Sequence, residues 1–144
     1  HYKEDNISLR LKLNSAINSQ ISVIFCLGES EDIKNNDQTK EFLADQLDLL
    51  TKDDFKLLTL AYEPIWAIGT GLNATSKYID EIHGFLKDYC QTRFALKQNV
   101  SVVYGGSVKL ENCEEILSSN NVDGLLIGGA SLDPETFSKI YNFS

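Results

Sequence analysis

The segment KLLTLAYE at residues 56–63 is an almost continuous apolar run that ends in a carboxylate, Glu63. Strands that are covered on both faces, as in parallel sheets, have this pattern, because neither face of the strand needs polar side chains. Three other runs have the same character, and they are ISVIFCLG (21–28), VSVVYGG (100–106) and VDGLLIGG (122–129). The sequence therefore predicts four parallel strands, each buried on both faces.

Stretches with helical spacing separate these runs. DQTKEFLADQLDLL (37–50) and KYIDEIHGFLKDYCQTRF (77–94) each place their apolar side chains on one side of a helix. Shorter helices are predicted at 8–17, 109–117 and 133–141, the last with Asp133 as its cap and Pro134 in its first position. This alternating order forms either a small open sheet or half of an eight-stranded barrel. The length favours the half, since a full barrel takes about 250 residues.

The composition narrows the class of protein. The 144 residues carry 13 basic and 21 acidic side chains, and the net charge of -8 is the wrong sign for a nucleic-acid partner. No apolar run is long enough to cross a membrane, so we expect no membrane partner. The cysteines Cys26, Cys90 and Cys113 lack the spacing of a metal site and indicate reduced thiols in a cytoplasmic location. Because the chain starts at His1 and contains no methionine, we expect 1–144 to be one domain and a fragment.

Glycine pairs follow two of the predicted strands, in YGGS (104–107) and IGGAS (127–131). Backbone N–H groups at such turns can hold a phosphate without a basic side chain, which suits an acidic chain. Either pair alone is more simply a tight turn between strand and helix. Two pairs on adjacent strands, with Ser107 after the first, favour a phosphate site.

Glu63, also at a strand end, would by itself be a structural acid. The loop PIWAIGTG (64–71) that follows it combines rigid and hinge residues, as a lid does, and this favours a catalytic base. Cys26 has no basic neighbour, so packing is a better interpretation than nucleophilic chemistry. Glu29 either bonds a neighbouring loop or faces solvent, and His83 lies on a predicted helix, away from the strand ends.

Together these motifs resemble the triosephosphate isomerase family. CLGE (26–29), AYEPIWAIGTG (61–71), YGGSV (104–108) and VDGLLIGGASL (122–132) stand in that family's order and spacing. The resemblance runs over all 144 residues but covers only the second half of the family's α/β barrel, the (β/α)8 TIM barrel. It implies four βα units, strands five to eight, and an N-terminal half that this sequence lacks. That half should carry the family's lysine and its electrophilic histidine.

The resemblance also implies roles for single residues. Glu63 matches the general base, and this family is a standard example of a glutamate base that acts with a neutral histidine. Glu29 matches the partner of the loop tryptophan, and Cys26 matches a supporting cysteine near the base. Backbone donors to the substrate phosphate match Gly69, Ser107, Gly128 and Gly129. The loop, itself a standard example of a closing lid, matches Pro64, Ile65, Trp66, Ala67, Ile68, Gly69, Thr70 and Gly71.

Three positions depart from the family's pattern. Leu72 and Ser76 stand where relatives more often have Lys and Pro, which bears on the hinge of the loop. Leu110 replaces a Pro at the start of a helix.

By this resemblance the whole protein would be an isomerase of glycolysis and gluconeogenesis. It would interconvert dihydroxyacetone phosphate and glyceraldehyde 3-phosphate as a cytoplasmic homodimer, without cofactor or metal. The present chain lacks the electrophile, so we expect it to be nearly inactive alone. The alternative from another class is a non-catalytic half barrel that binds phosphate and pairs with itself or with another half.

Overall fold

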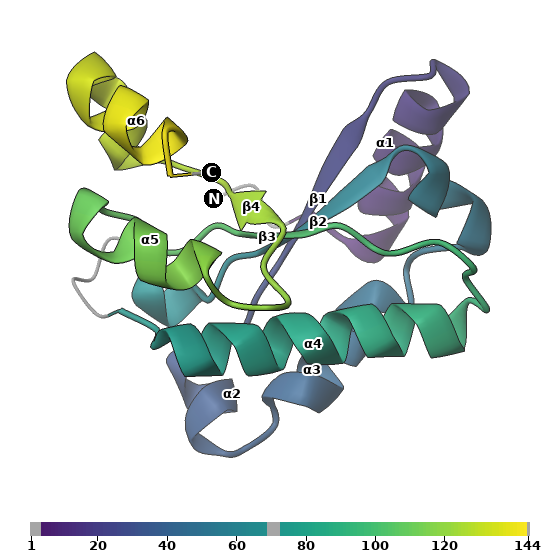
Figure 1. Ribbon diagram of the computed structural model, residues 1–144. Coiled ribbons are helices and arrows are strands. Elements are labelled where there is room, and N and C mark those ends of the chain that lie inside the picture. Colours follow the sequence, from purple (N-terminus) through teal and green to yellow (C-terminus); the bar gives the residue numbers. More distant parts are fainter. Residues whose placement is uncertain (1–3, 69–72, 144) are drawn as a thin grey trace.

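The computed structural model describes residues 4–68 and 73–143. They form an α/β fold around one four-stranded parallel sheet (Figure 1). The helices and strands are α1 (Asn6–Asn18), β1 (Val23–Leu27), α2 (Glu31–Asn35), α3 (Thr39–Leu47), β2 (Leu58–Tyr62), α4 (Ser76–Arg93), β3 (Val102–Tyr104), α5 (Leu110–Leu117), β4 (Gly124–Leu125) and α6 (Pro134–Tyr141). Short 3-10 turns are η1 (Lys52–Lys56), η2 (Ile65–Ala67) and η3 (Gly129–Leu132). The four predicted strands and the five predicted helices are confirmed, whereas α2 and the 3-10 turns were not predicted.

The order of the strands indicates a segment of a barrel. Each strand pairs in parallel with the next one along the chain, from β1 to β4. The register places Cys26 opposite Ala61 and Tyr62 opposite Tyr104. A doubly wound sheet reverses its strand order at a switch point, and this sheet does not reverse. The observed winding is therefore that of successive βα units around part of a barrel.

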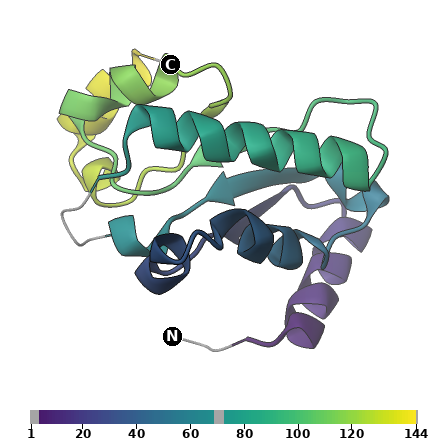
Figure 2. The same ribbon diagram turned by 90° about the horizontal axis from the view of Figure 1, so that it is seen from below.

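Helices cover the outer face of the sheet, where the core lies. Helices α3 and α4 contact each other and lie side by side in both views (Figures 1 and 2). The strand residues that point toward these helices are fully buried, and so are the helix residues that meet them. They are Leu60, Tyr62, Val102 and Tyr104 on the strands and Leu43, Leu47, Ile79 and Leu86 on the helices. The predicted apolar sides of the two long helices are therefore the sides that pack.

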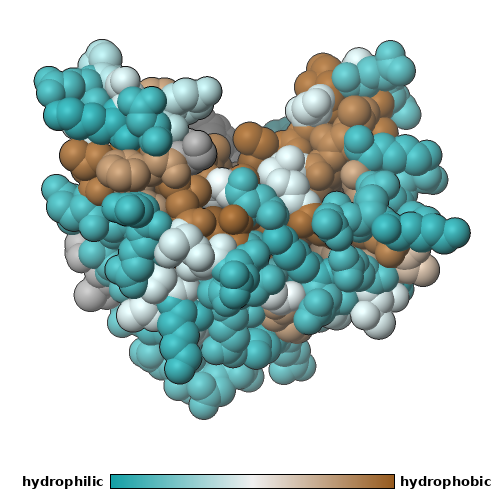
Figure 3. Space-filling model, in the orientation of Figure 1, coloured by the Kyte–Doolittle hydropathy of each residue, from teal (hydrophilic) through white to brown (hydrophobic). Residues whose placement is uncertain are grey.

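The inner face of the sheet is open, and the prediction of burial on both faces is wrong for this side. Ile24 on β1 keeps 53% of its surface exposed, and Cys26 on the same face is exposed as well. Along the strand, exposed and more buried residues alternate, as they do when only one face of a strand is covered. Figure 3 shows hydrophobic surface on both sides of a notch between the α1/β1 end and the α6 end. The described residues place no second layer over this face.

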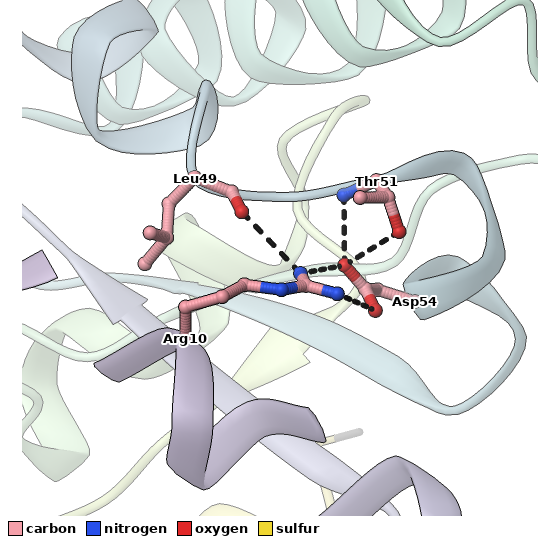
Figure 4. A network of polar contacts seen from close by, with 4 residues as sticks. All are labelled: Arg10, Leu49, Thr51 and Asp54. Atoms are coloured by element: carbon pink, nitrogen blue, oxygen red, sulfur yellow. Dashed lines mark hydrogen bonds and ion pairs between the residues drawn. The ribbon is translucent and has the colours of Figure 1, made fainter. Parts of the chain in front are cut away.

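A partly buried ion pair joins α1 to the turn that leads into β2 (Figure 4). Two nitrogens of the Arg10 guanidinium donate to the Asp54 carboxylate, at 2.5 and 3.2 Å. The Thr51 N–H and hydroxyl also donate to this carboxylate, at 2.7 and 3.0 Å, and Arg10 donates to the Leu49 carbonyl oxygen. Because Asp54 is almost fully buried, these donors replace the water that it loses on folding. The network ties the first helix to the loop that leads into the central strand.

The last helix begins as the sequence predicts. The Asp133 carboxylate accepts a hydrogen bond from the Thr136 N–H at 3.0 Å, and Pro134 occupies the first turn.

Within residues 4–68 and 73–143, no helix combines the length and the apolar character that a membrane span requires.

Candidate active site

Glu63 follows the last residue of β2 and points to the inner face of the sheet. Its N–H donates to the Leu27 carbonyl oxygen at 2.8 Å, so the pairing with β1 continues to this residue. Strand alternation puts its side chain on the same side as that of Ala61. The side chain is half-buried, and this burial raises the pKa of the carboxyl above its ordinary value, against a hydrogen bond from Cys26 that lowers it. A raised pKa makes the carboxylate a stronger base than a solvated one.

Two glycines on the neighbouring strands make room for Glu63. A Cβ at Gly105, after β3, would lie 2.6 Å from Cγ and 2.9 Å from Oε1 of the Glu63 side chain. A Cβ at Gly28, after β1, would lie 1.9 Å from the Glu63 carbonyl oxygen. Gly105 therefore leaves space for the Glu63 side chain, and Gly28 lets the backbone after β1 approach the backbone of Glu63 closely. In the sequence Gly105 belongs to a glycine pair that favours a phosphate site, and the contact of Gly28 and Gly105 with Glu63 was not predicted.

Cys26 borders the Glu63 side chain, and the prediction that it is packed is wrong for this chain. The residue is exposed, because the inner face lacks a cover. Partial loss of water around its sulfur, together with the negative charge of Glu63, raises the pKa of the thiol to about 11. The thiol therefore stays protonated near neutral pH and serves as a hydrogen-bond donor to the carboxylate rather than as a nucleophile.

Glu29 holds the start of the loop that follows Glu63. It is fully buried, and the Trp66 indole N–H donates to its Oε1 at 2.8 Å. The hydroxyls of Tyr62 and Tyr78 donate to the same oxygen, at 3.0 and 3.3 Å, and the Ile65 N–H donates to the Glu29 carbonyl oxygen at 3.0 Å. Of the two sequence-based alternatives for Glu29, contact with a neighbouring loop is thus the observed one.

Part of the predicted loop lies outside the described residues. Pro64 precedes the 3-10 turn η2, whose Trp66 and Ala67 are buried, while Ile65 and Ile68 are exposed. The predicted phosphate donor Gly69, the loop residues Thr70 and Gly71, and the departure at Leu72 fall in the segment that the structure does not describe.

The candidate phosphate donors after β3 and β4 lie at the ends of adjacent strands. Ser107 is half-buried, and its carbonyl oxygen accepts from the Asn112 side chain at 3.0 Å. Gly128 precedes the short turn η3, and its carbonyl oxygen accepts from the N–H and hydroxyl of Ser131, at 3.0 and 2.7 Å. A Cβ at Gly128 or Gly129 would have no atom within 4 Å. The chain after Gly128 thus forms a four-residue 3-10 turn beside open space.

His83 is buried against the outer face of the strands. Its ring centroid lies 5.9 Å from that of Tyr62 and 6.4 Å from that of Tyr104. Burial lowers the pKa of the imidazole to about 4, so it stays neutral at pH 7. The sequence carries a signal for this burial, because His83 shares the apolar side of α4 with Ile79, Ile82, Leu86 and Cys90.

Comparison with known proteins decides the family of this chain. The family model described as triosephosphate isomerase matches residues 1–144. The chain belongs to the triosephosphate isomerase family. The resemblance of its motifs to that family is thereby confirmed, as is its fold class, part of a TIM barrel.

Curated relatives bear the name of the family. A triosephosphate isomerase of Thermodesulfovibrio yellowstonii is 41% identical over 145 residues, which cover 99% of this chain and 58% of the relative. One from Neurospora crassa is 43% identical over 134 residues, covering 86% of this chain and 52% of the relative. One from Francisella tularensis subsp. mediasiatica is 41% identical over 146 residues, with 98% and 58% covered. The chain thus spans little more than half the length of the triosephosphate isomerases that it matches.

No group of three or more His, Cys, Asp or Glu side chains within residues 4–68 and 73–143 is arranged to hold a metal ion. The polar groups at the strand ends include the Glu63 carboxylate, the Cys26 thiol, the Ser107 hydroxyl and backbone amides. Such groups can move a proton and bind an anion.

Proposed function

We propose that the whole protein is a triosephosphate isomerase that interconverts dihydroxyacetone phosphate and glyceraldehyde 3-phosphate through an enediol, in glycolysis and gluconeogenesis. The observation that carries the proposal is Glu63, a half-buried carboxylate of raised pKa that follows the last residue of β2. Membership of the family supports it. Glu63 removes a proton from one carbon of the triose and returns it to the adjacent carbon, while the carbonyl is polarised by an electrophile and a proton moves from one oxygen of the triose to the other.

The substrate phosphate binds across the ends of β3 and β4. Backbone N–H groups of Ser107, Gly128 and Gly129, with Gly69 from the loop, donate to it. Open space above Gly128 and Gly129 supports this proposal, because a phosphate requires direct approach to the backbone. Backbone donors also explain how a chain with a net charge of -8 binds an anion.

Residues 64–71 form the lid, which closes over the substrate and excludes water from the enediolate. Contact of Glu29 with Ile65 and Trp66 supports an anchored first part of this lid. Cys26 orients the base, because its thiol donates a hydrogen bond to the carboxylate. The reaction needs no cofactor in this proposal.

An N-terminal half completes the barrel and covers the inner face, so that 1–144 is the C-terminal half of one domain. The exposed Ile24 and the span of little more than half of the relatives support this arrangement. The missing half supplies the electrophile that polarises the triose carbonyl. The complete enzyme is a homodimer in the cytoplasm, with neither nucleic acid nor membrane as a partner.

The test is isomerisation of glyceraldehyde 3-phosphate by the 144-residue chain, alone and after mixing with a separately produced N-terminal half. We expect activity only after mixing, because the chain alone lacks the electrophile. Glu63→Gln is the control, and its mixture with the N-terminal half should be inactive. If both halves are folded and associated but remain inactive, the non-catalytic half barrel is the better account. Activity of the Glu63→Gln mixture would refute the assignment of the base.

A further inference from the structure

We propose that Lys34 is a positioning residue that holds the first turn of the lid in place through the indole ring of Trp66. The inference rests on the proposed function, in which residues 64–71 close over a substrate. The Lys34 ammonium nitrogen lies 4.0 Å from the centroid of the Trp66 ring. This distance is well inside the range of about 6 Å at which a cation is attracted to the face of an aromatic ring, and Trp is the strongest such partner.

The geometry around Trp66 divides into an edge contact and a face contact. The edge is held by Glu29, which accepts from the indole N–H at 2.8 Å. A hydrogen bond at the edge does not by itself fix the plane of the ring. Lys34 restricts that rotation from the face, and Tyr78 does so from the side, with its ring centroid 6.0 Å away at an interplanar angle of 66°.

Both holding groups come from one short segment of the chain. Glu29 lies just before α2, and Lys34 lies in the last turn of that helix. The Ser30 side chain caps α2 by accepting from the Ile33 N–H, so the helix sets the spacing between the two. The Glu29 carbonyl oxygen also accepts from the Ile65 N–H at 3.0 Å. The segment from Glu29 to Lys34 therefore contacts the backbone of the turn η2 and both the edge and the face of the Trp66 ring.

Charge pairing also favours the ring as the partner of Lys34. Its ammonium forms no ion pair with any residue within 4–68 and 73–143. Lys40, which lies nearby in the next helix, instead pairs with Glu81 at 2.7 Å. The nearest aromatic contacts of Lys34 are Trp66 and, at 5.9 Å, Tyr78. When the first turn of the lid moves away, Lys34 loses both the ring and its partial shelter from water.

The experiment uses Trp66 itself, because it is the only tryptophan of the chain. Lys34→Met removes the charge and keeps an unbranched side chain, so it isolates the cation. We expect a red-shifted emission and an increase of about two- to five-fold in the acrylamide quenching constant. This factor corresponds to the free energy with which a cation and an aromatic ring attract each other at an exposed site. Lys34→Arg should restore the parent values, since a guanidinium also stacks on an indole. Lys40→Met, which removes an equal charge without touching Trp66, should leave them unchanged.

Several outcomes would contradict the proposal. Parent-like quenching and emission in Lys34→Met would show that the ammonium does not hold the ring. An equal change in Lys40→Met would attribute the effect to net charge. In the enzyme reconstituted with its N-terminal half, Lys34→Met should lower kcat/KM at an unchanged melting temperature, and Lys34→Arg should restore it. Inactivity of the reconstituted parent would refute the proposed function, whereas the fluorescence result would still decide the contact between Lys34 and Trp66.

Discussion

Glu63 takes its position from residues that have almost no side chain of their own. Gly28 allows the backbone of β1 to approach the Glu63 carbonyl oxygen, and Gly105 leaves space for the Glu63 side chain. Cys26, the third neighbour, is a protonated thiol at neutral pH. The carboxylate thus lies beside a thiol donor, and the Glu63 side chain fills the space that a side chain at position 105 would take. Two predictions follow at the scale of these residues.

The first prediction concerns the effect of the negative charge of Glu63 on the pKa of the Cys26 thiol. Glu63→Gln should lower the pKa of the Cys26 thiol from about 11, because the second cause of that raised pKa, the negative charge, is removed. Burial, the larger cause, remains, so the pKa of the thiol should stay above its ordinary value. The measurement is the rate of iodoacetamide labelling of Cys26 against pH, with Cys90 and Cys113 buried and slow. A labelling curve identical to that of the parent would contradict the contact.

The second prediction concerns the space at Gly105. Gly105→Ala should leave the fold intact, because the three atoms nearest to the new Cβ all belong to the Glu63 side chain, which can shift. The same Cβ should push the carboxylate from its place and lower the turnover of the reconstituted enzyme by about 10²-fold, as misplacement of a catalytic group by about 1 Å does. Steady-state kinetics with a melting curve measure both effects.

Gly124→Ala is the matched control for this change. It adds the same methyl group on the next strand, 3.4 Å from a Val103 methyl carbon, and should preserve turnover. Turnover of Gly105→Ala equal to that of Gly124→Ala would show that the space at Gly105 does not position the base.

At the scale of elements, α1 depends on one ion pair. Arg10→Met should lower the free energy of unfolding by about 3 kcal/mol, because it leaves the nearly buried Asp54 carboxylate without a cation. Urea unfolding measures the change. Lys56→Met is the control, since its pair with Asp53 is exposed and its loss should have no measurable effect. A loss in Arg10→Met as small as that of the control would mean that Thr51 alone satisfies the carboxylate.

The network around Asp54 also makes the stability of the fold depend on pH in the acid range. Burial acts to raise the pKa of Asp54, but the hydrogen bonds from Arg10 and Thr51 outweigh it and hold the pKa below the ordinary value. A carboxyl whose pKa is lowered by folding stabilises the fold above the unfolded pKa, near 4. This contribution is lost only as the pH falls through the lowered value.

Helix α4 carries the second prediction at this scale, through His83. Folding lowers the pKa of this imidazole from 6.5 to about 4, so the unfolded chain takes up the proton first. Stability should be full above pH 6.5 and should fall by about 3 kcal/mol as the pH decreases to about 4. The charged groups near the ring partly offset one another, with Lys87 lowering its pKa and Asp80 and Asp123 raising it.

The pH series of urea unfolding measures this loss. His83→Leu, which cannot titrate, should flatten the slope between pH 6.5 and 4 while the loss due to Asp54 at lower pH remains. An unchanged slope in His83→Leu would assign the pH dependence to other groups.

At the scale of the whole molecule, the open inner face decides the behaviour of the chain in solution. Ile24→Lys should reduce self-association, because it places a charge on the exposed apolar face of an edge strand. It should also weaken binding of an N-terminal half to the same face. Sedimentation velocity measures both, with the exposed Asn120→Lys as a control of equal charge. Equal association of the two variants would show that the inner face is not the contact surface.

Much of the architecture follows from local patterns. Continuous apolar runs predicted the strands, and the apolar sides of residues 77–94 predicted the packed side of α4. The capping of α6 by Asp133 depends on neighbours in sequence and was predicted as well. The exposure of Cys26 was not, because a continuous apolar run does not say whether the layer that should cover its second face belongs to the same chain.

By itself the sequence determined the order of strands and helices, the family and the candidate base, since each of these depends on residue types at short spacing. Only the tertiary structure decided what surrounds the base. Gly28, Gly105 and Cys26 lie far from Glu63 in sequence and meet it because parallel pairing brings the ends of β1, β2 and β3 to one edge. The grip of Glu29 and Lys34 on Trp66 arises in the same way. Contacts of this kind depend on strand register and helix placement, which no local pattern encodes.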